Sequence, residues 1–157
     1  MGEVSAYERL QIESVLAGRA ADVQSGVGLV LIPDLVTFRL VHDIAVLPAM
    51  AKNSLNVLGP EKVFDSDSVL SEVRKWVMSA EVIVADVTAL NPHVMYVLGL
   101  AHGLGRCPIM LSLGAIDLPF NLRALRCLSY SDSKQGLIDL REELGRAIRV
   151  FLMSSRA

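Results

Sequence analysis

The sequence predicts an α/β protein built on a doubly wound parallel sheet of five strands. Two continuous apolar runs, Val27 to Ile32 and Val82 to Ala85, lack the alternation of a half-exposed strand and are typical of strands covered on both faces. Most successive strand patterns are separated by about a dozen residues or more, which is what a parallel crossover requires. Right-handed crossovers then favour the flavodoxin-like strand order 2-1-3-4-5.

An additional helix is predicted before the sheet. Apolar side chains recur at a loose helical spacing from residue 4 to residue 22, and Gln24-Ser25-Gly26 breaks this pattern. We therefore divide the chain into an N-terminal helix and linker, residues 1–24, and a single α/β domain, residues 25–157.

The elements of the α/β domain follow in order. Their expected bounds are strands over 27–32, 55–58, 82–85, 109–113 and 128–130, and helices over 36–52, 69–78, 92–103 and 135–152. Pro48 should kink the helix over 36–52 or end it early, because proline has no N–H to donate. Asp65 to Ser68 offer N-caps for the next helix, while Asn91 caps the helix that begins at Pro92. The inward residues of the last helix are Leu137, Leu140, Leu144, Ile148 and Phe151.

Composition favours a small-molecule ligand. The net charge of -2 lacks the basic excess that a protein binding the nucleic-acid backbone needs, so we expect no nucleic-acid partner. No apolar run reaches the roughly 18 residues that span a bilayer, and acidic Glu3 and Glu8 stand where a signal peptide would be basic, so we expect a cytoplasmic protein without membrane contact. The hydrophobic fraction of 52% is high and favours a homodimer or a larger homo-oligomer.

The cysteines predict neither a disulfide nor a metal site. Cys107 and Cys127 form no CxxC motif and no Cys/His cluster, so we expect two buried thiols. No metal and no cofactor are predicted. In an open parallel sheet, ligands bind beyond the carboxyl ends of the strands. The segments expected there are Pro33-Asp34, Asp86 to Asn91 and Gly114 to Arg123.

The central strand and helix resemble a known family. Three segments carry the resemblance: Ala85-Asp86-Val87-Thr88, Asn91 to His102, and Leu118 to Arg123. They are similar to two patterns of the nucleoside 2-deoxyribosyltransferase-like superfamily, A-D-[LV]-T-x-x-N-P-N-V-x-Y-E-L-G-x-A-H and P-F-D-L-R. The resemblance covers about Val27 to Leu152. It implies a flavodoxin-like fold, association into dimers or larger oligomers, and chemistry at the N-glycosidic bond of nucleosides or nucleotides.

One position departs from the chemistry that the resemblance implies. Family enzymes use a carboxylate on the central helix to attack the anomeric carbon, which gives a glycosyl-enzyme that a base or water then resolves. Val97 occupies that position. Its isopropyl group has no lone pair to donate, so ordinary turnover by the family mechanism is not expected.

Several residues near Val97 are candidate ligand contacts. The expected set is Pro33, Asp34, Asp86, Thr88, Asn91, His93, Val97, Asn121 and Arg123. Asp86 has two interpretations: a displaced nucleophile or base, or a cap for the turn formed by residues 87–89. His93 shares a helix face with Val97 and is either a ligand contact or an exposed first-turn histidine, whereas His102 lies about 140° around the helix. Arg123 either binds phosphate or ties down its loop, and Asn121 replaces the family aspartate.

Two further features bear on ligand binding and association. The N–H groups at the start of the helix that begins at Pro92, with the positive end of its dipole, suit an anion such as a nucleotide phosphate. Tyr96 is interpreted as a packing or dimer residue. We expect Asp86→Ala to weaken ligand binding more than it lowers thermal stability, on the premise that an acid at a strand end contributes little to packing.

Three functions are consistent with the sequence. The first is a nucleotide- or nucleoside-binding protein of this superfamily that lacks the standard nucleophile and acts as a sensor or regulatory domain. The second is an active N-glycosidase or deoxyribosyltransferase that uses Asp86 or water. The third is a ligand-free dimeric interaction module.

Overall fold

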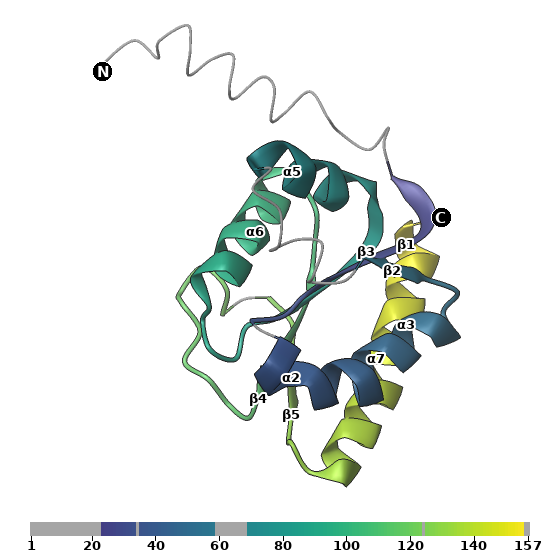
Figure 1. Ribbon diagram of the computed structural model, residues 1–157, viewed down its shortest axis with the longest axis vertical. Helices are drawn as coiled ribbons and strands as arrows, with labels where there is room; N and C mark the ends of the chain where they lie inside the picture. Colours follow the sequence, from purple (N-terminus) through teal and green to yellow (C-terminus); the bar gives the residue numbers. More distant parts are fainter. Residues whose placement is uncertain (1–22, 34, 59–68, 124, 156–157) are drawn as a thin grey trace, which may run out of the picture.

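The computed structural model describes residues 23–33, 35–58, 69–123 and 125–155 (Figure 1). The expected N-terminal helix, Asp34 and the N-caps at 65–68 lie outside these residues. Five parallel strands form one sheet in the order β2-β1-β3-β4-β5, which confirms the predicted fold class. The strands are β1 (Gln24–Leu31), β2 (Asn56–Leu58), β3 (Ala80–Asp86), β4 (Ile109–Leu113) and β5 (Cys127–Tyr130).

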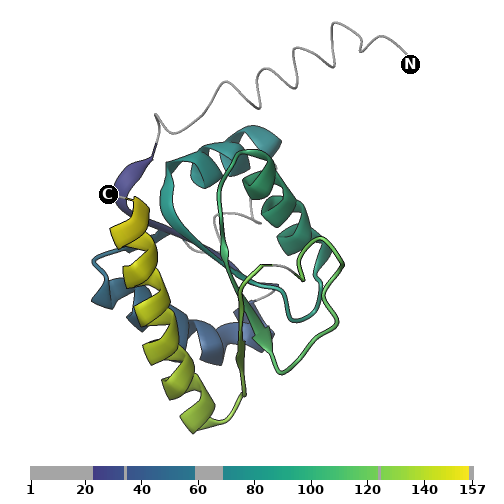
Figure 2. The same ribbon diagram turned by 180° about the vertical axis from the view of Figure 1, so that it is seen from behind.

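Helices cover both faces of the sheet. They are α2 (Leu35–Val41), η1 (His42–Val46), α3 (Leu47–Lys52), α5 (Val69–Ser79), α6 (Pro92–Gly103) and α7 (Lys134–Ser155). One face carries α5 and α6, and the other carries α7 with the run from α2 to α3 (Figures 1 and 2). Within the described residues, no helix is long and apolar enough to cross a membrane.

The first strand begins earlier than expected. The strand was predicted over 27–32, but Gln24 to Gly26 also belong to β1 and form an irregularity in its pairing with β3 between Gln24 and Gly28. Gly26 has a φ of +81°, which glycine adopts at little cost, and its N–H donates to Glu81 Oε2 at 2.7 Å. The glycine signal therefore marks a bulge within the strand.

Pro48 alters its helix without ending it. The Leu47 N–H donates to the His42 carbonyl, five residues back, and His42–Val46 is a π-helical turn. Proline cannot donate a hydrogen bond, and its ring would crowd the carbonyl four residues earlier, that of Ile44. The wider turn accommodates the proline, and helical structure continues to Lys52.

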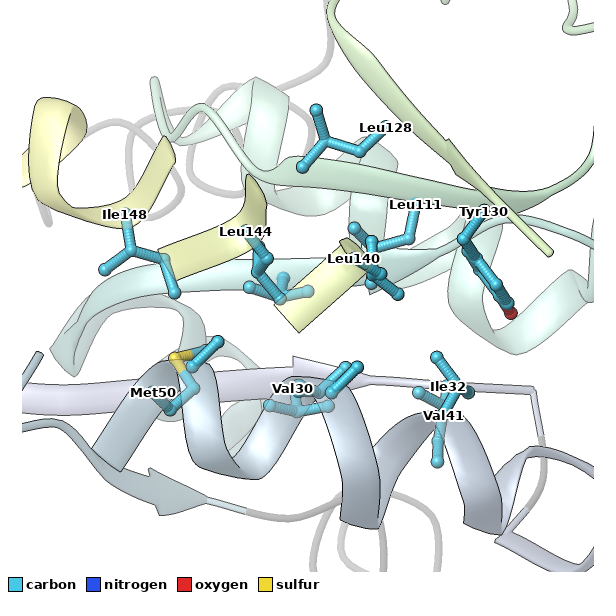
Figure 3. Close-up of a cluster of buried hydrophobic side chains, with 14 of the residues drawn as sticks. Val30, Ile32, Val41, Met50, Leu111, Leu128, Tyr130, Leu140, Leu144 and Ile148 are labelled. Atoms are coloured by element: carbon cyan, nitrogen blue, oxygen red, sulfur yellow. The ribbon is translucent and has the colours of Figure 1, made fainter. Parts of the chain in front are cut away.

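The larger apolar core lies between the sheet and α7. Figure 3 shows the α7 side chains Leu140, Leu144 and Ile148 facing the labelled residues of β1 and of the run from α2 to α3. The labelled members are Val30, Ile32, Val41, Met50, Leu111, Leu128, Tyr130, Leu140, Leu144 and Ile148. Four of the five inward residues predicted for α7 are buried, but Phe151 is half-buried and Leu152 is buried instead.

The two cysteines differ in exposure. Cys107, which precedes β4, is exposed, so the prediction of a buried thiol is wrong there. It lies in the connection between α6 and β4, at the edge of the sheet where the strands begin. Cys127 begins β5 and is half-buried.

Candidate ligand site at the carboxyl edge

Asp86 ends β3 and is completely buried, with 0% of its surface exposed. The Tyr130 hydroxyl donates to Asp86 Oδ2 at 2.6 Å. The Thr88 N–H donates to Asp86 Oδ1 at 2.9 Å, and the Thr88 hydroxyl donates to the same oxygen. Both carboxyl oxygens are therefore hydrogen-bonded within the protein.

These bonds connect three strands at the carboxyl edge. Thr88 Oγ1 also accepts a hydrogen bond from the Leu113 N–H at 2.9 Å, which ties the turn after β3 to the end of β4. Tyr130 is the last residue of β5. The premise that a strand-end acid contributes little to packing is wrong for Asp86, because this carboxyl is the buried acceptor that joins Thr88 to Tyr130.

Burial dominates the electrostatics of this group. It raises the pKa of Asp86 above its ordinary value, and the hydrogen bonds from Thr88 and Tyr130 lower the pKa only in part. Burial, together with the neighbouring carboxylate, also raises the pKa of Tyr130. Tyr130 therefore stays a protonated phenol that donates to Asp86.

Replacing Asp86 by Asn should change how stability depends on pH. The pKa of Asp86 is raised in the folded protein, so the folded protein still holds a proton that the unfolded chain releases near pH 4. The contribution of Asp86 to the unfolding free energy therefore falls as pH rises through the native pKa. Asp86→Asn removes this titration. We expect its stability relative to the unmodified protein to increase as pH rises above about 4. Urea denaturation of both proteins across the pH range measures the difference; a difference independent of pH would contradict the raised pKa.

Asn91 caps α6 as predicted. Asn91 Oδ1 accepts hydrogen bonds from the N–H groups of His93 at 2.9 Å and Val94 at 3.3 Å. Pro92 has no N–H, so the donors expected to hold an anion already have a partner inside the protein. An anion at this point would be attracted by the helix dipole and by neighbouring side chains.

Leu90, just before the cap, has an unusual backbone. Its φ is +46°, in the left-handed region that a leucine rarely adopts. Its N–H donates to the Val87 carbonyl at 2.9 Å, closing the turn between β3 and α6. Strained residues of this kind concentrate at functional loops, at a cost of about 1–3 kcal/mol. Nothing in the sequence pattern distinguished Leu90.

Val97 and His93 lie in different surroundings. Val97 is 3% exposed and belongs to the apolar cluster between α6 and the sheet. His93 is exposed at the first turn of α6, and Tyr96 is 53% exposed. The residue that the resemblance matches to the nucleophile is therefore covered by apolar neighbours, whereas His93 is exposed.

The loop between β4 and β5 is held by Arg123. Its Nε donates to the Leu118 carbonyl at 2.8 Å, and its Nη2 pairs with Asp117 Oδ1 at 2.7 Å. Arg123 thus ties down the loop, as one of its two interpretations anticipated. Asn121 is exposed on the same loop, and Pro33 is half-buried after β1.

Tyr130 is the site residue that sequence analysis missed. A usable signal was present, because β5 alternates between exposed and buried positions and places Leu128 and Tyr130 on the buried side. A buried tyrosine hydroxyl needs a partner. An acid ending β3, which is separated from β5 by β4 but ends at the same edge of the sheet, was the available acceptor.

Comparisons with known proteins provide no family assignment. The chain matches no protein-family model and no curated protein. The resemblance to the nucleoside 2-deoxyribosyltransferase-like superfamily rests on the sequence motifs alone, and the sheet order agrees with the fold that the resemblance implies.

Proposed function

We propose that the protein binds a nucleoside or nucleotide at the carboxyl edge of its sheet without cleaving it, as a sensor or regulatory member of the nucleoside 2-deoxyribosyltransferase-like superfamily. The motif residues from Ala85 to Thr88 and from Asn91 to His102 support this proposal, since they form the end of β3 and almost all of α6. A crevice beyond the carboxyl ends is where ligands bind in sheets of this topology.

The proposal rests on one observation: neither Val97 nor Asp86, the two candidate nucleophile positions, presents an accessible carboxylate. Val97 has no carboxylate and packs in an apolar cluster. Asp86 has a carboxylate, but it is buried and accepts hydrogen bonds from Thr88 and Tyr130. A nucleophile must reach within about 3–3.5 Å of the carbon that it attacks, so neither residue favours catalysis in this arrangement.

In this proposal, binding relies on the exposed polar residues at the carboxyl edge. His93 at the start of α6 and Asn121 on the β4–β5 loop are exposed and can donate to or accept from a base, a sugar hydroxyl or a phosphate. The dipole of α6 adds attraction for a phosphate. The ligand class follows from the superfamily resemblance, and these side chains are compatible with it.

The homodimer and the cytoplasmic location are part of the same proposal. Large apolar side chains are exposed in segments that follow the carboxyl ends of β1, β3 and β4; they are Val36, Leu90 and Phe120. Exposed apolar groups that gather at one edge favour association. Tyr96 lies on α6 and is compatible with the same interface.

Thermal-shift titration with a panel of nucleosides and nucleotides tests the proposal. A ligand at 100 times its Kd should add about 2.7 kcal/mol to the unfolding free energy and raise Tm by several degrees. His93→Ala should reduce this shift, whereas Met153→Ala, an exposed residue near the far end of α7, should leave it unchanged. Chromatography of the same mixtures should recover the ligand intact.

Each alternative function has its own outcome. Release of free base by the unmodified protein would show an active N-glycosidase or transferase that uses Asp86 or water. No thermal shift with any compound in the panel would overturn binding and favour the interaction module.

A further inference from the structure

The outer side of α2 carries two exposed apolar side chains. Val36 is 91% exposed and Leu40 is 62% exposed. Because they are four residues apart, they lie one above the other on the same side of the helix. The opposite side, which contains Phe38 and Val41, is buried in the core (Val41 in Figure 3). The described residues therefore leave one apolar side of α2 uncovered.

A cation and an anion lie on the same outer side. Arg39, in the last turn of α2, and Asp43, in the first turn of η1, are both exposed. With Val36 and Leu40 they occupy the i, i+3, i+4 and i+7 positions of one helix side, which we call the α2 face. Asp43 Oδ1 pairs with His42 Nδ1 at 2.8 Å, whereas Arg39 forms no ion pair with any described residue. The cation of the α2 face is therefore open to a further carboxylate.

We propose that the α2 face packs against the α2 face of a second copy of this chain, with the two helices antiparallel and related by a two-fold axis beside Leu40. The proposal names the interface of the homodimer proposed above, and so it rests on that part of the proposed function. It does not depend on a ligand at the carboxyl edge.

The charges of the α2 face complement a copy of the same face. In a two-fold interface, residue i contacts residue j of the partner and j contacts i, so the patch must complement itself. Arg39 and Asp43 are about 6 Å apart along the helix axis. A two-fold axis between them brings the Arg39 of each copy level with the Asp43 of the other. Two ion pairs then flank the contact, whereas a parallel arrangement would oppose like charges.

The apolar residues occupy matching positions in this arrangement. The two-fold axis passes close to Leu40, so the two Leu40 side chains meet at the centre of the contact. Val36 lies one turn before Leu40 and extends the apolar contact at both ends. Packed helices lie about 8–10 Å apart between their axes, a distance at which side chains of this size touch. An apolar centre with charged groups beside it is the usual anatomy of a protein interface.

Charge exchange in the full chain tests the arrangement. Arg39→Asp alone and Asp43→Arg alone each oppose like charges at two points, so each should raise the dissociation constant of the dimer at least about ten-fold. When the two variants are mixed in equal amounts, both opposite-charge contacts return, and the dissociation constant of the heterodimer should lie within about three-fold of the unmodified value. Sedimentation velocity measures the constants, and native mass spectrometry identifies the heterodimer.

Exposed positions on α7 provide the controls. Arg149→Asp reverses an exposed positive charge outside α2 and should leave the dissociation constant unchanged. Leu40→Asp places a carboxylate at the apolar centre and should raise the constant at least about ten-fold. Met153→Asp introduces the same group at a position that is 70% exposed and should not change the constant. Circular dichroism of each variant confirms that the domain is folded.

Three results would overturn the proposal. An unmodified protein that is monomeric at micromolar concentration would remove the homodimer and its interface together. A dimer unaffected by Leu40→Asp would keep the homodimer and place its interface on another surface. A mixture of folded Arg39→Asp and Asp43→Arg proteins that forms no heterodimer would exclude the antiparallel pairing. Ligand binding is measured separately by the thermal-shift titration, so its failure stays distinct from the failure of this interface.

Discussion

Asp86→Ala should lower the unfolding free energy by about 3 kcal/mol, because a buried polar group left without its partner costs about 1–3 kcal/mol. The substitution removes the acceptor of the Tyr130 hydroxyl and of the Thr88 N–H and hydroxyl. Asp86 is completely buried, and its hydrogen bond with Tyr130 is buried as well. Urea denaturation at neutral pH measures the loss.

Two further substitutions identify the cause of the stability lost in Asp86→Ala. Asp117→Ala removes an exposed acid paired with Arg123 on the neighbouring loop and should cost less than about 1 kcal/mol. Tyr130→Phe removes the donor to Asp86, so it should cost clearly less in the Asp86→Ala protein than in the unmodified one. Additive effects, or a loss below about 1 kcal/mol for Asp86→Ala, would contradict a structural role for this hydrogen bond.

The fold was predictable because its signals are local. Unbroken apolar runs identified β1 and β3, the Asn91-Pro92 pair identified the start of α6, and regular spacing identified α7. The details that differ from the prediction or go beyond it concern residues whose conformation depends on neighbouring elements. Gly26 proved to be a bulge because β3 pairs on both sides of it, and Pro48 was accommodated by a π-helical turn because the surrounding helix is held against α7.

The candidate site was predictable only in part. Chain order placed Asp86 and Asn91 at the carboxyl edge of the sheet, where the structure has them, because Asp86 ends β3 and Asn91 precedes α6. Side-chain partners were not predictable, because the Tyr130 hydroxyl reaches Asp86 from 44 residues away in sequence. The backbone of Leu90 is likewise set by the closure of the turn, which no residue preference predicts.

Val97→Glu should produce the largest change at the site, in both stability and chemistry. Val97 is 3% exposed within an apolar cluster, so a charged carboxylate there should lower the unfolding free energy by about 3 kcal/mol or more at neutral pH. Tyr96→Glu adds the same group at the exposed neighbouring position of α6 and should have little effect. Urea denaturation of the two variants measures the contrast.

The pH dependence of Val97→Glu distinguishes charge from shape. Burial raises the pKa of a carboxyl, so the folded variant should hold a proton that the unfolded chain releases near pH 4.3. Its stability should then approach that of Val97→Gln at low pH and fall below it as pH rises. A constant difference between these two variants would mean that the new carboxyl has reached solvent in the folded protein.

The chemical result for Val97→Glu follows from the longer side chain. Glutamate extends two bonds beyond the branch point of valine, which allows its carboxylate to leave the apolar cluster toward the ligand that we propose at the carboxyl edge. If the nucleophile is the only missing part, base should be released slowly from a nucleoside or nucleotide that the unmodified protein binds intact, and Val97→Gln should release none. Chromatography for free base measures this. A folded Val97→Glu protein that binds the ligand and releases no base would show that the site has lost more than its nucleophile, because a correctly positioned carboxylate is the group that forms the glycosyl-enzyme in retaining chemistry.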